Sequence, residues 1–323
     1  MNTLDAIKNL VSENFQAVEH LISSRLSQEI PLIDQLSHHL INGGGKRLRP
    51  LIVLLSAEIC RYHGDKQIVL AAAVEYFHTA TLLHDDVVDE SSLRRGRETA
   101  NTIWGSKTSI LVGDYLFTQC FRWMLDTKNM KALDLFAGIA YEISRGEIKQ
   151  LTLRHNANVE ISDYFEVIRS KTALLFSASA ELGACVAEGS EAIREALRNY
   201  GLHLGNAFQM VDDALDYSSS ADVMGKNIGD DLADGKMTLP LFCAIHRGTK
   251  EQALIVKECI QNGSLTRLPE ILKIVEETKA IDYTYELANK EVNKAIAALS
   301  VFEDSPYKEG LVALACFAIS RAH

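Results

Sequence analysis

The chain has 323 residues, 47% of them hydrophobic, so it is long enough to bury a large core. Its formal net charge of −10 argues against non-specific binding to nucleic acid or anionic lipid, so an anionic ligand must be held by local basic clusters. Six cysteines without a C-x-x-C pair are typical of free thiols in a reducing compartment. With no secretory signal and no apolar stretch long enough for a transmembrane segment, we expect a cytoplasmic protein that makes at most transient membrane contact.

Helical periodicity runs along the whole chain. Apolar residues recur at spacings of three and four, as around Leu133 and Phe136, and no convincing strand pattern is present. Only five prolines occur, with none between Pro50 and Pro240, which permits long helices. We therefore predict an all-α fold in a single domain, residues 1–323. The predicted helices span residues 4–24, 28–41, 50–62, 66–91, 99–126, 129–154, 162–188, 191–220, 237–246, 249–262, 269–279, 280–299 and 307–321.

The first basic cluster lies just before the predicted helix 50–62, in the stretch GGGKRLRP. Lys46 and Arg49 follow three glycines and precede Pro50, which is favoured at the start of a helix. Glycines let the backbone approach a phosphate, and a helix N-terminus attracts anions. The cluster therefore indicates a phosphate site, or alternatively a helix C-cap followed by solvated charges.

An acidic motif, HDDVVDE, ends the predicted helix 66–91. Asp85 and Asp89 are four residues apart and share one helix face, where like charges repel. Magnesium relieves that repulsion, because it takes oxygen ligands and is commonly held by one or two carboxylates together with substrate phosphates. The same pattern recurs as DDALD, beginning at Asp212. Two copies flanked by apolar residues favour a magnesium clamp for a diphosphate over exposed acidic helix faces.

Further basic residues lie close to the first acidic motif. Arg94 and Arg95 follow it by about one helical turn, and an arginine fork matches phosphate oxygens. Pairing with Asp89 or Glu90 is the alternative. His78 lies seven residues before the motif, on nearly the same helix face, and is either a phosphate ligand or an ordinary core histidine.

Three lysines complete the candidate site. Lys226 and Lys236 bracket the glycine-rich stretch GKNIGDDLADGK after the second acidic motif, and Lys171 lies in SKTALLF. As a loop over the metal site, this stretch would deliver both of its lysines to a diphosphate. A plain surface loop is the alternative.

Together these residues resemble the trans-isoprenyl diphosphate synthase family, and within it the bacterial octaprenyl diphosphate synthases that make the ubiquinone side chain. The resemblance covers nearly the whole chain and includes GGGKRLRP, HTATLLHDDVVDESSLRRG, VGDYLFT, SKTALLF, AFQMVDDALDY and GKNIGDDLADGKMTLPL. It implies a helical bundle around a central apolar cavity, usually in a homodimer. One departure is Met237, where the family usually has proline.

The resemblance also implies roles for individual residues. Magnesium would be bound by Asp85, Asp89 and Asp212. The allylic diphosphate would be contacted by Arg94 with help from Lys171, Lys226 and Lys236. Isopentenyl diphosphate would be bound by Lys46, Arg49, His78 and Arg95. Thr172 and Gln209 would lie beside the allylic carbons, where their oxygen dipoles stabilise a cation without trapping it.

The implied reaction begins when the carbon–oxygen bond of the allylic diphosphate ionises, aided by magnesium and cationic side chains. The double bond of isopentenyl diphosphate attacks the cation, and a proton then leaves to the departing diphosphate, because no side chain stands out as the base. Clustered carboxylates have raised pKa values until metal binds, so we expect activity to fall at mildly acid pH.

Product length depends on the residues one turn before the first acidic motif. Ala80 and Thr81 are small, so a growing chain can pass along the helix face. Each added isoprene unit needs about 5 Å, roughly one helical turn. We expect the cavity to end at bulkier residues such as Phe121, Trp123 or Met124, which are alternatively ordinary core.

Three other functions are alternatives to a long-chain synthase. A shorter-chain, geranylgeranyl-type synthase has the same motifs. A terpene cyclase would typically replace the second acidic motif with an Asn/Asp-Ser/Thr-Glu pattern, and a regulatory subunit without activity usually loses an acidic motif or the basic residues. Both acidic motifs and the basic residues are present here, which argues against the cyclase and the regulatory subunit.

Overall fold

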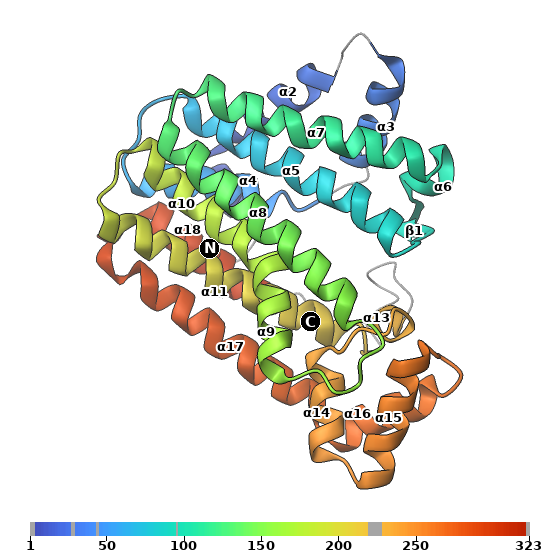
Figure 1. Cartoon of the computed structure of the whole chain (residues 1–323). Helices are drawn as coiled ribbons and strands as arrows, with labels where there is room; N and C mark the ends of the chain where they lie inside the picture. The colour runs from blue at the N-terminus through green and yellow to red at the C-terminus, as the bar shows by residue number, and fades with distance from the viewer. Residues whose placement is uncertain (1–3, 27–29, 43–44, 95, 219–227, 321–323) are drawn as a thin grey trace. The chain divides into compact units, whose positions relative to one another are not determined.

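The structure is a computed structural model that describes residues 4–26, 30–42, 45–94, 96–218 and 228–320. Almost every regular element within these residues is a helix, which confirms the predicted all-α class (Figure 1). No helix among them is both long and apolar enough to cross a membrane.

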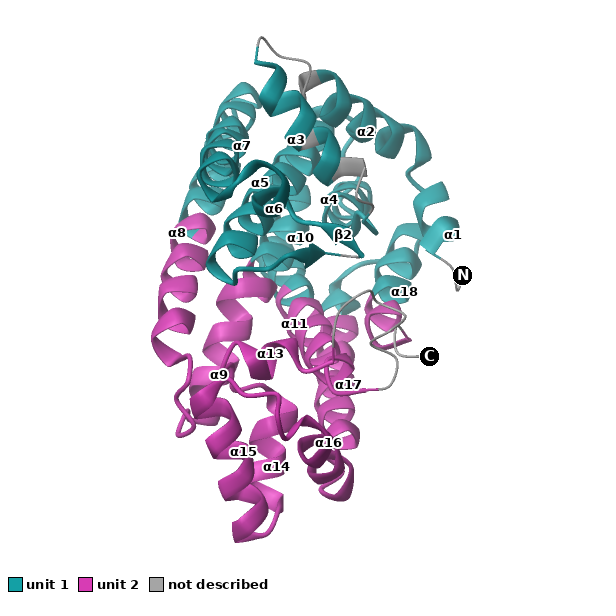
Figure 2. Ribbon diagram, turned by 90° about the vertical axis from the view of Figure 1, so that its right-hand side faces the viewer, with its two compact units in different colours: residues 1–138, 175–201, 298–314 teal, residues 139–174, 202–297, 315–323 magenta. Residues whose placement is uncertain are grey.

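Packing divides the chain into two compact units, each assembled from separate stretches of sequence (Figure 2). Unit 1 contains residues 1–138, 175–201 and 298–314. Unit 2 contains residues 139–174, 202–297 and 315–323. Several helices contribute residues to both units, among them α8 (Met130–Leu153), α11 (Glu191–Leu215) and α18 (Pro306–Ser320).

Unit 1 is organised around one buried helix, α5, whose residues from Leu70 to Phe77 are almost fully inaccessible. Helices α2, α4 and α7 pack against it, and Figure 1 shows α5 running between α4 and α7. The other elements of unit 1 are shorter or lie outside this core. The bounds are α1 Leu4–Asn9, α2 Ser12–Leu26, α3 Pro31–Asn42, α4 Leu48–Ile59, α5 Lys66–Val88, β1 Leu93–Arg94, β2 Arg97–Glu98, α6 Ala100–Trp104, α7 Ser106–Asp126 and the 3-10 turn η2 Leu299–Val301. Most of α10, Leu174–Val186, also belongs to unit 1.

Unit 2 combines the site-bearing helices α9 and α11 with a cluster of shorter helices. Apolar residues of α14, α15 and α16, among them Leu241, Val256 and Ile271, form a buried core there. The bounds are α9 Ile161–Ile168, the π-helical turn η1 Arg169–Ala173, α13 Asp230–Ala233, α14 Leu239–Arg247, α15 Lys250–Asn262, α16 Leu268–Glu277 and α17 Ala280–Ala298.

The structure corrects several predicted boundaries. The predicted helix 99–126 is broken at Gly105, whose φ of 83° is left-handed and interrupts the α-helical hydrogen bonding. The predicted helix 66–91 ends three residues early, at Val88, and leads into the short hairpin β1–β2, for which no strand was predicted. Two-residue strands carry too little alternation to be recognised in sequence.

Candidate functional site

The first aspartate motif lies at the C-terminal end of α5 in unit 1. Asp85 and Asp89 are half-buried, and the Asp89 backbone N–H donates to the Asp85 carbonyl at 2.8 Å. This i, i+4 bond places both carboxylates on one face, as predicted from their spacing. The middle residue, Asp86, is only 1% exposed and faces the interior of the unit.

The carboxylate of Asp86 is paired with Arg94 from β1. Nη2 and Nε of Arg94 lie 2.7 Å and 2.9 Å from Asp86 Oδ1. Burial raises the pKa of Asp86, and the adjacent guanidinium counteracts part of that rise. Arg94 therefore does have a carboxylate partner, but it is Asp86 rather than the suggested Asp89 or Glu90.

The segment after α5 is held by hydrogen bonds from α6. The Asn101 amide donates to the carbonyls of Asp86 at 3.2 Å and Ser91 at 3.1 Å, and the Thr99 hydroxyl donates to Ser91 at 2.7 Å. These bonds hold the turn after α5 in the conformation that brings Arg94 into contact with Asp86. Arg95, the other predicted phosphate ligand here, lies outside the described residues.

The basic cluster at the start of α4 contains residues with different surroundings. Arg47 adopts a left-handed conformation, with φ of 51°, and is bound to Glu75 at 2.5 Å and Glu19 at 3.1 Å. The Arg49 guanidinium stacks 4.4 Å above the ring centroid of Phe176, while Lys46 is exposed. The pairing of Arg47 with two glutamates explains why only its neighbours remain candidate phosphate ligands.

The residues predicted to control product length lie on α5 of unit 1, where Ala80 is buried and Thr81 is half-buried. Ala80 is fully buried, and the Thr81 hydroxyl donates to the carbonyl of half-buried His78 at 2.8 Å. An aromatic cluster lies on α5, α7 and α8, with ring centroids 5.1–5.7 Å apart: Phe77, Phe117, Phe121 and Phe136. Of the proposed floor residues, Phe121 joins this cluster, whereas Trp123 instead packs on Tyr76 and Met124 is fully buried.

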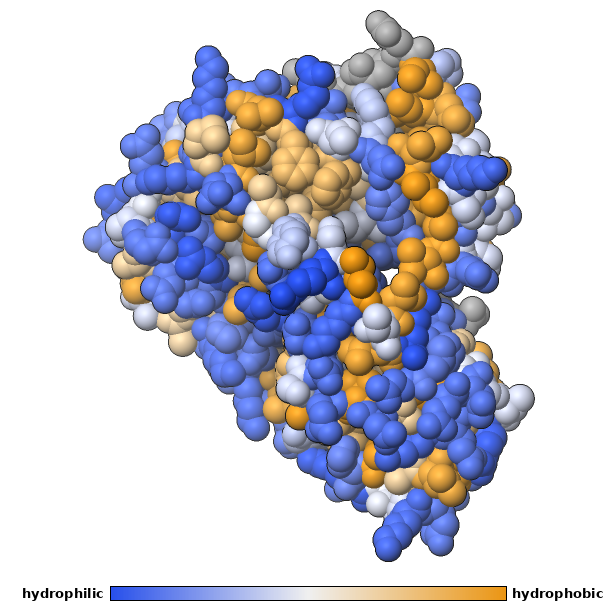
Figure 3. Space-filling model, in the orientation of Figure 1, coloured by the Kyte–Doolittle hydropathy of each residue, from blue (hydrophilic) through white to orange (hydrophobic). Residues whose placement is uncertain are grey.

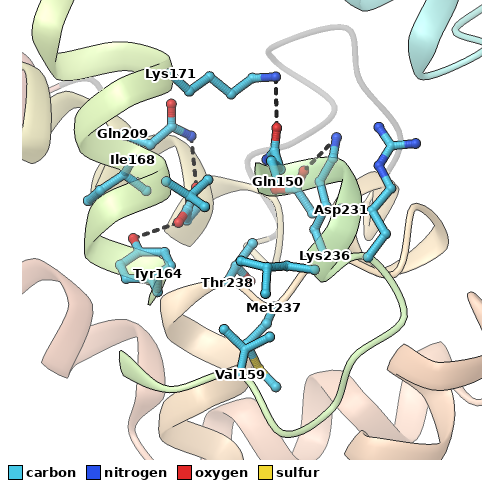
Figure 4. Close-up of a pocket in the computed structure, with 14 residues that line it drawn as sticks. Gln150, Val159, Tyr164, Ile168, Lys171, Gln209, Asp231, Lys236, Met237 and Thr238 are labelled. Atoms are coloured by element: carbon cyan, nitrogen blue, oxygen red, sulfur yellow. Dashed lines mark hydrogen bonds and ion pairs between the residues drawn. The ribbon is translucent and has the colours of Figure 1, made fainter. Parts of the chain in front are cut away.

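A pocket in unit 2 gathers several of the other predicted residues (Figure 4). Its empty volume is about 650 Å³, including space open to solvent. Lys171, Gln209 and Lys236 line it, and so does Met237, which thus contacts the site despite its departure from the family pattern. The remaining lining residues include Gln150, Arg154, Val159, Tyr164, Ile168, Asp213, Asp231 and Thr238.

Each pocket lysine is held by oxygen acceptors. Nζ of Lys171 lies 3.0 Å from both Glu147 Oε2 and Gln150 Oε1. Nζ of Lys236 lies 2.6 Å from Asp234 Oδ2 and 3.8 Å from Asp231 Oδ1. Lys171 lies within the π-helical turn η1, a type of local distortion that is frequent at functional sites. Two ammonium groups thus lie at one pocket, as an anionic substrate requires.

A continuous set of hydrogen bonds crosses the pocket wall. The Thr172 hydroxyl donates to Gln209 Oε1 at 2.6 Å, and Gln209 Nε2 donates to Asp213 Oδ1 at 2.9 Å. The Tyr164 hydroxyl donates to the other oxygen of Asp213 at 2.7 Å (Figure 4). The predicted pair of Thr172 and Gln209 is therefore brought into direct contact.

Burial dominates the electrostatics of this network. Burial and the nearby charge of Asp231 raise the pKa of Asp213 to about 7, although hydrogen bonds from Gln209 and Tyr164 act in the opposite direction. Burial also raises the pKa of Tyr164 well above its usual value, so its phenol stays protonated and donates to the Asp213 carboxyl group.

The other residues of the second acidic motif have different surroundings. Asp212 is half-buried on α11, one residue before Asp213. Asp216 accepts a hydrogen bond from the Asp231 backbone N–H at 3.3 Å, and its carbonyl accepts from Gly229 at 3.0 Å. Asp216 thus ties the following loop to α11. Lys226, predicted to lie in that loop, falls outside the described residues.

The predicted site residues are therefore divided between the two units. Unit 1 holds the first motif with Lys46, Arg49, His78 and Arg94, and unit 2 holds the pocket with Asp212. That the two acidic motifs face each other stays a prediction. Sequence reasoning missed Tyr164 and Asp231, and it assigned no role to Asp213 although it recognised the motif.

Comparison with known proteins identifies the family. The polyprenyl synthetase family model matches residues 30–277. An octaprenyl diphosphate synthase of Haemophilus influenzae is 42% identical over 99% of this chain and 97% of its own length.

Solved structures agree with this assignment. The polyprenyl synthase of Caulobacter crescentus, complexed with calcium and isoprenyl diphosphate, is 43% identical with a TM-score of 0.95, over 99% of this chain and 98% of that one. A decaprenyl diphosphate synthase of Rhodobacter capsulatus is 40% identical with a TM-score of 0.94, over 99% of this chain and all of the other. The resemblance drawn from the motifs is confirmed, and the chain belongs to the polyprenyl synthetase family.

Proposed function

We propose that this prenyltransferase is a long-chain trans-polyprenyl diphosphate synthase that makes octaprenyl diphosphate for a quinone side chain. It condenses isopentenyl diphosphate onto an allylic diphosphate, with farnesyl diphosphate as the starter. The observation that carries the proposal is the unit 2 pocket, which is lined by two ammonium groups and by Gln209, whose amide oxygen accepts a hydrogen bond from Thr172. Such a pocket binds a diphosphate and offers dipoles, rather than a nucleophile, to a carbocation.

The acidic motifs fit magnesium. Asp85, Asp89 and Asp212 offer the carboxylate oxygens that this ion takes as ligands, and the first two share a helix face. Among the residues that the structure describes, no three His, Cys, Asp or Glu side chains are grouped as a ready-made site. This agrees with magnesium held by one or two carboxylates together with substrate phosphates. When bound, the ion supplies positive charge that stabilises the leaving diphosphate.

Basic residues of both units are assigned to the two diphosphates. The allylic diphosphate is bound by Lys171, Lys226 and Lys236 with Arg94, and isopentenyl diphosphate by Lys46, Arg49, His78 and Arg95. The guanidinium of Arg94 carries five N–H donors, so binding to Asp86 through two nitrogens still allows a phosphate contact. In the pocket, phosphate oxygens replace the glutamate and aspartate partners of the two described lysines.

The chain's own residues then favour charge separation. Thr172 and Gln209 turn oxygen dipoles toward the allylic carbons, and their mutual hydrogen bond fixes the position of one oxygen relative to the other. The proton released after carbon–carbon bond formation goes to the departing diphosphate. Apolar pocket residues such as Val159 and Ile168 restrict water that would otherwise capture the cation.

Product length is assigned to unit 1. Ala80 is small, so it presents no bulky side chain to a product that grows along α5, and the aromatic cluster around Phe121 and Phe136 is bulky enough to stop a growing chain. Ala80→Tyr is expected to shorten the product, whereas Ala80→Ser, which keeps the residue small, leaves product length unchanged. Unchanged length in the tyrosine variant would refute this gate.

We assign the two units to one cytoplasmic synthase domain that functions as a homodimer. The family match across residues 30–277 includes both units, which supports a single domain. Apolar side chains gather on the face crossed by α7 (Figure 3), where Leu111 is 69% and Leu125 55% exposed. These leucines are fourteen residues apart and so form one stripe suited to a second copy.

The dimer is tested by light scattering in solution. The wild type is expected at twice the chain mass of 35.8 kDa, and Leu111→Glu at one chain. Leu254→Glu is a matched control, because Leu254 is 58% exposed on α15 of unit 2. A wild type that is monomeric would exclude the dimer.

The activity is tested with purified protein, magnesium, farnesyl diphosphate and excess labelled isopentenyl diphosphate, followed by chromatography of dephosphorylated products. An eight-unit product supports the proposal, and a four-unit product favours the shorter-chain alternative. No incorporation would favour a regulatory subunit. Asp85→Asn is the control, with incorporation expected to fall by about 100-fold or more.

A further inference from the structure

Tyr164 is a buried residue of the pocket to which sequence analysis assigned no role. Its side chain is 4% exposed on α9, and its hydroxyl donates to Asp213 at 2.7 Å. The second oxygen of Asp213 accepts from Gln209, which in turn accepts from Thr172. Tyr164 is thus the far end of a chain of hydrogen bonds that reaches the two oxygens proposed to face the allylic cation; Figure 4 draws the bonds made by Tyr164 and by the Gln209 amide nitrogen.

The donors in this chain have a fixed direction. Both oxygens of Asp213 accept hydrogen bonds, one from the Tyr164 hydroxyl and the other from Gln209, which turns its amide nitrogen toward the carboxyl group. The amide oxygen then necessarily faces Thr172, whose hydroxyl proton is used in that bond. The lone pairs of both oxygens remain available to a positive charge, whereas a flipped amide would present its N–H groups and repel it.

Two helical segments support the network from both ends. Tyr164 and Thr172 lie on one continuous helical stretch, because the π-helical turn η1 follows α9 directly. Gln209 and Asp213 are one turn apart on α11. The bonds therefore cross between the same two segments twice, and loss of the Tyr164 hydroxyl would leave the Asp213 carboxylate free to rotate.

We infer that Tyr164 is a positioning residue that acts through Asp213 to fix the amide orientation of Gln209. The inference rests on the proposed function at one point: the ordered oxygens of Thr172 and Gln209 are taken to stabilise a carbocation. It predicts that Tyr164 affects the chemical step far more than substrate binding, because its hydroxyl is satisfied within the protein.

The first test is a double-mutant cycle on the full chain with Tyr164→Phe and Gln209→Ala. Tyr164→Phe is expected to lower kcat about tenfold or more while KM for either diphosphate changes less than threefold. In the Gln209→Ala background, the same substitution should have almost no further effect, because the group it positions is gone. If the double variant lowers kcat by the product of the two single-variant losses, the two residues act independently and the inference is overturned.

Tyr200→Phe is the matched control. Tyr200 is fully buried in unit 1, and its hydroxyl donates to the Leu311 carbonyl at the same 2.7 Å. Any effect of this variant on kcat should be independent of Gln209→Ala. If the control couples to Gln209 as strongly as Tyr164→Phe does, a general loss of stability is the explanation and the inference fails.

A second measurement does not depend on turnover. The side-chain amide protons of Gln209, identified by NMR as the pair that disappears in Gln209→Ala, should exchange slowly with solvent in the wild type. Tyr164→Phe is expected to speed their exchange about tenfold, and Tyr200→Phe to leave it unchanged. Unchanged exchange in Tyr164→Phe would overturn the inference even in an active enzyme, whereas an inactive wild type with this protection would overturn only the proposed function.

Discussion

The two aspartate motifs share one sequence pattern, yet the charges of their middle residues are compensated differently. Asp86 is 1% exposed and lies 2.7 Å from the guanidinium of Arg94. Asp213 is 3% exposed and receives hydrogen bonds from two neutral groups, the Tyr164 phenol and the Gln209 amide. The motif thus buries the middle carboxylate in both copies, and residues outside the motif determine whether its partner is a cation.

The different partners of Asp86 and Asp213 suit the two carboxyl groups to different tasks. Pairing with Arg94 counteracts part of the rise that burial causes in the pKa of Asp86, and it places a cation close to the predicted metal ligands. Neutral donors leave the pKa of Asp213 near 7, but they give its carboxylate a fixed direction that the adjacent amide must follow. One copy is suited to holding charge and the other to orienting a neighbour.

The largest expected effect is a pH dependence from Asp213. In metal-free protein, the native carboxyl holds its proton up to about pH 7, whereas the unfolded one loses it near 3.8. The free energy of unfolding should therefore fall as pH rises from 4 through 7, with a contribution of at most about 4 kcal/mol. Asp213→Asn should remove this slope in urea denaturation with a chelator present. Parallel profiles for the two proteins would contradict the assignment.

Glu291→Gln provides the control for this profile. Although burial acts to raise it, the pKa of Glu291 is lowered to about 2 by hydrogen bonds from His203, Lys294 and Asn206. Its stabilising contribution is complete above about pH 4.5 and is lost as pH falls toward 2. The variant should therefore change stability without changing the slope between pH 5 and 7.

Much of the fold could be predicted from sequence because helix periodicity is a local signal. The long helices α5, α8 and α11 were expected at nearly their observed positions. The break at Gly105 was not, since a single glycine inside an amphipathic pattern is compatible with either a continuous or an interrupted helix. The π-helical turn was missed as well, because its extra residue changes hydrogen bonding without changing composition.

The site was predictable where its residues carry charge in a fixed spacing. Asp85, Asp89 and Lys236 were recognisable for that reason, whereas the partner of a buried group depends on tertiary packing. Tyr164 contacts Asp213 across 49 residues of sequence, and no local pattern links them. Sequence analysis accordingly named candidate ligands and missed Tyr164, whose contact with Asp213 depends on tertiary packing.

The next largest effect is expected from removing the cation in unit 1. Arg94→Ala leaves Asp86 buried without its ion-pair partner, which should cost about 3 kcal/mol of unfolding free energy, because one partner of the pair is fully buried. Adding Asp86→Asn should recover most of that loss, since no uncompensated charge remains. Urea denaturation at pH 8 measures both variants, and a cost below 1 kcal/mol for the single variant would mean that the ion pair is not what compensates Asp86.

The smallest effects concern the glycine turns that follow the two motifs. Gly96 has φ of 73° with nothing within 4 Å of an added Cβ. Gly96→Ala should therefore lower the free energy of unfolding by only about 1 kcal/mol, because alanine is strained in the left-handed conformation. Gly235 has φ of 64°, and an added Cβ would lie 2.3 Å from Nδ1 of His155. Gly235→Ala should therefore cost about 2 kcal/mol and, unlike Gly96→Ala, displace the adjacent Lys236 and lower activity.

The larger loss of unfolding free energy expected for Gly235→Ala comes from the imidazole ring of His155. His155 donates its backbone N–H to the Gly235 carbonyl at 2.9 Å, and its Nδ1 lies 3.2 Å from the Ile260 carbonyl, so the ring is held against the turn. Combining Gly235→Ala with His155→Ala should reduce the cost to that of Gly96→Ala in thermal and urea unfolding. If the cost stays at about 2 kcal/mol, backbone strain alone explains the cost at Gly235, and packing of the His155 ring does not constrain Lys236.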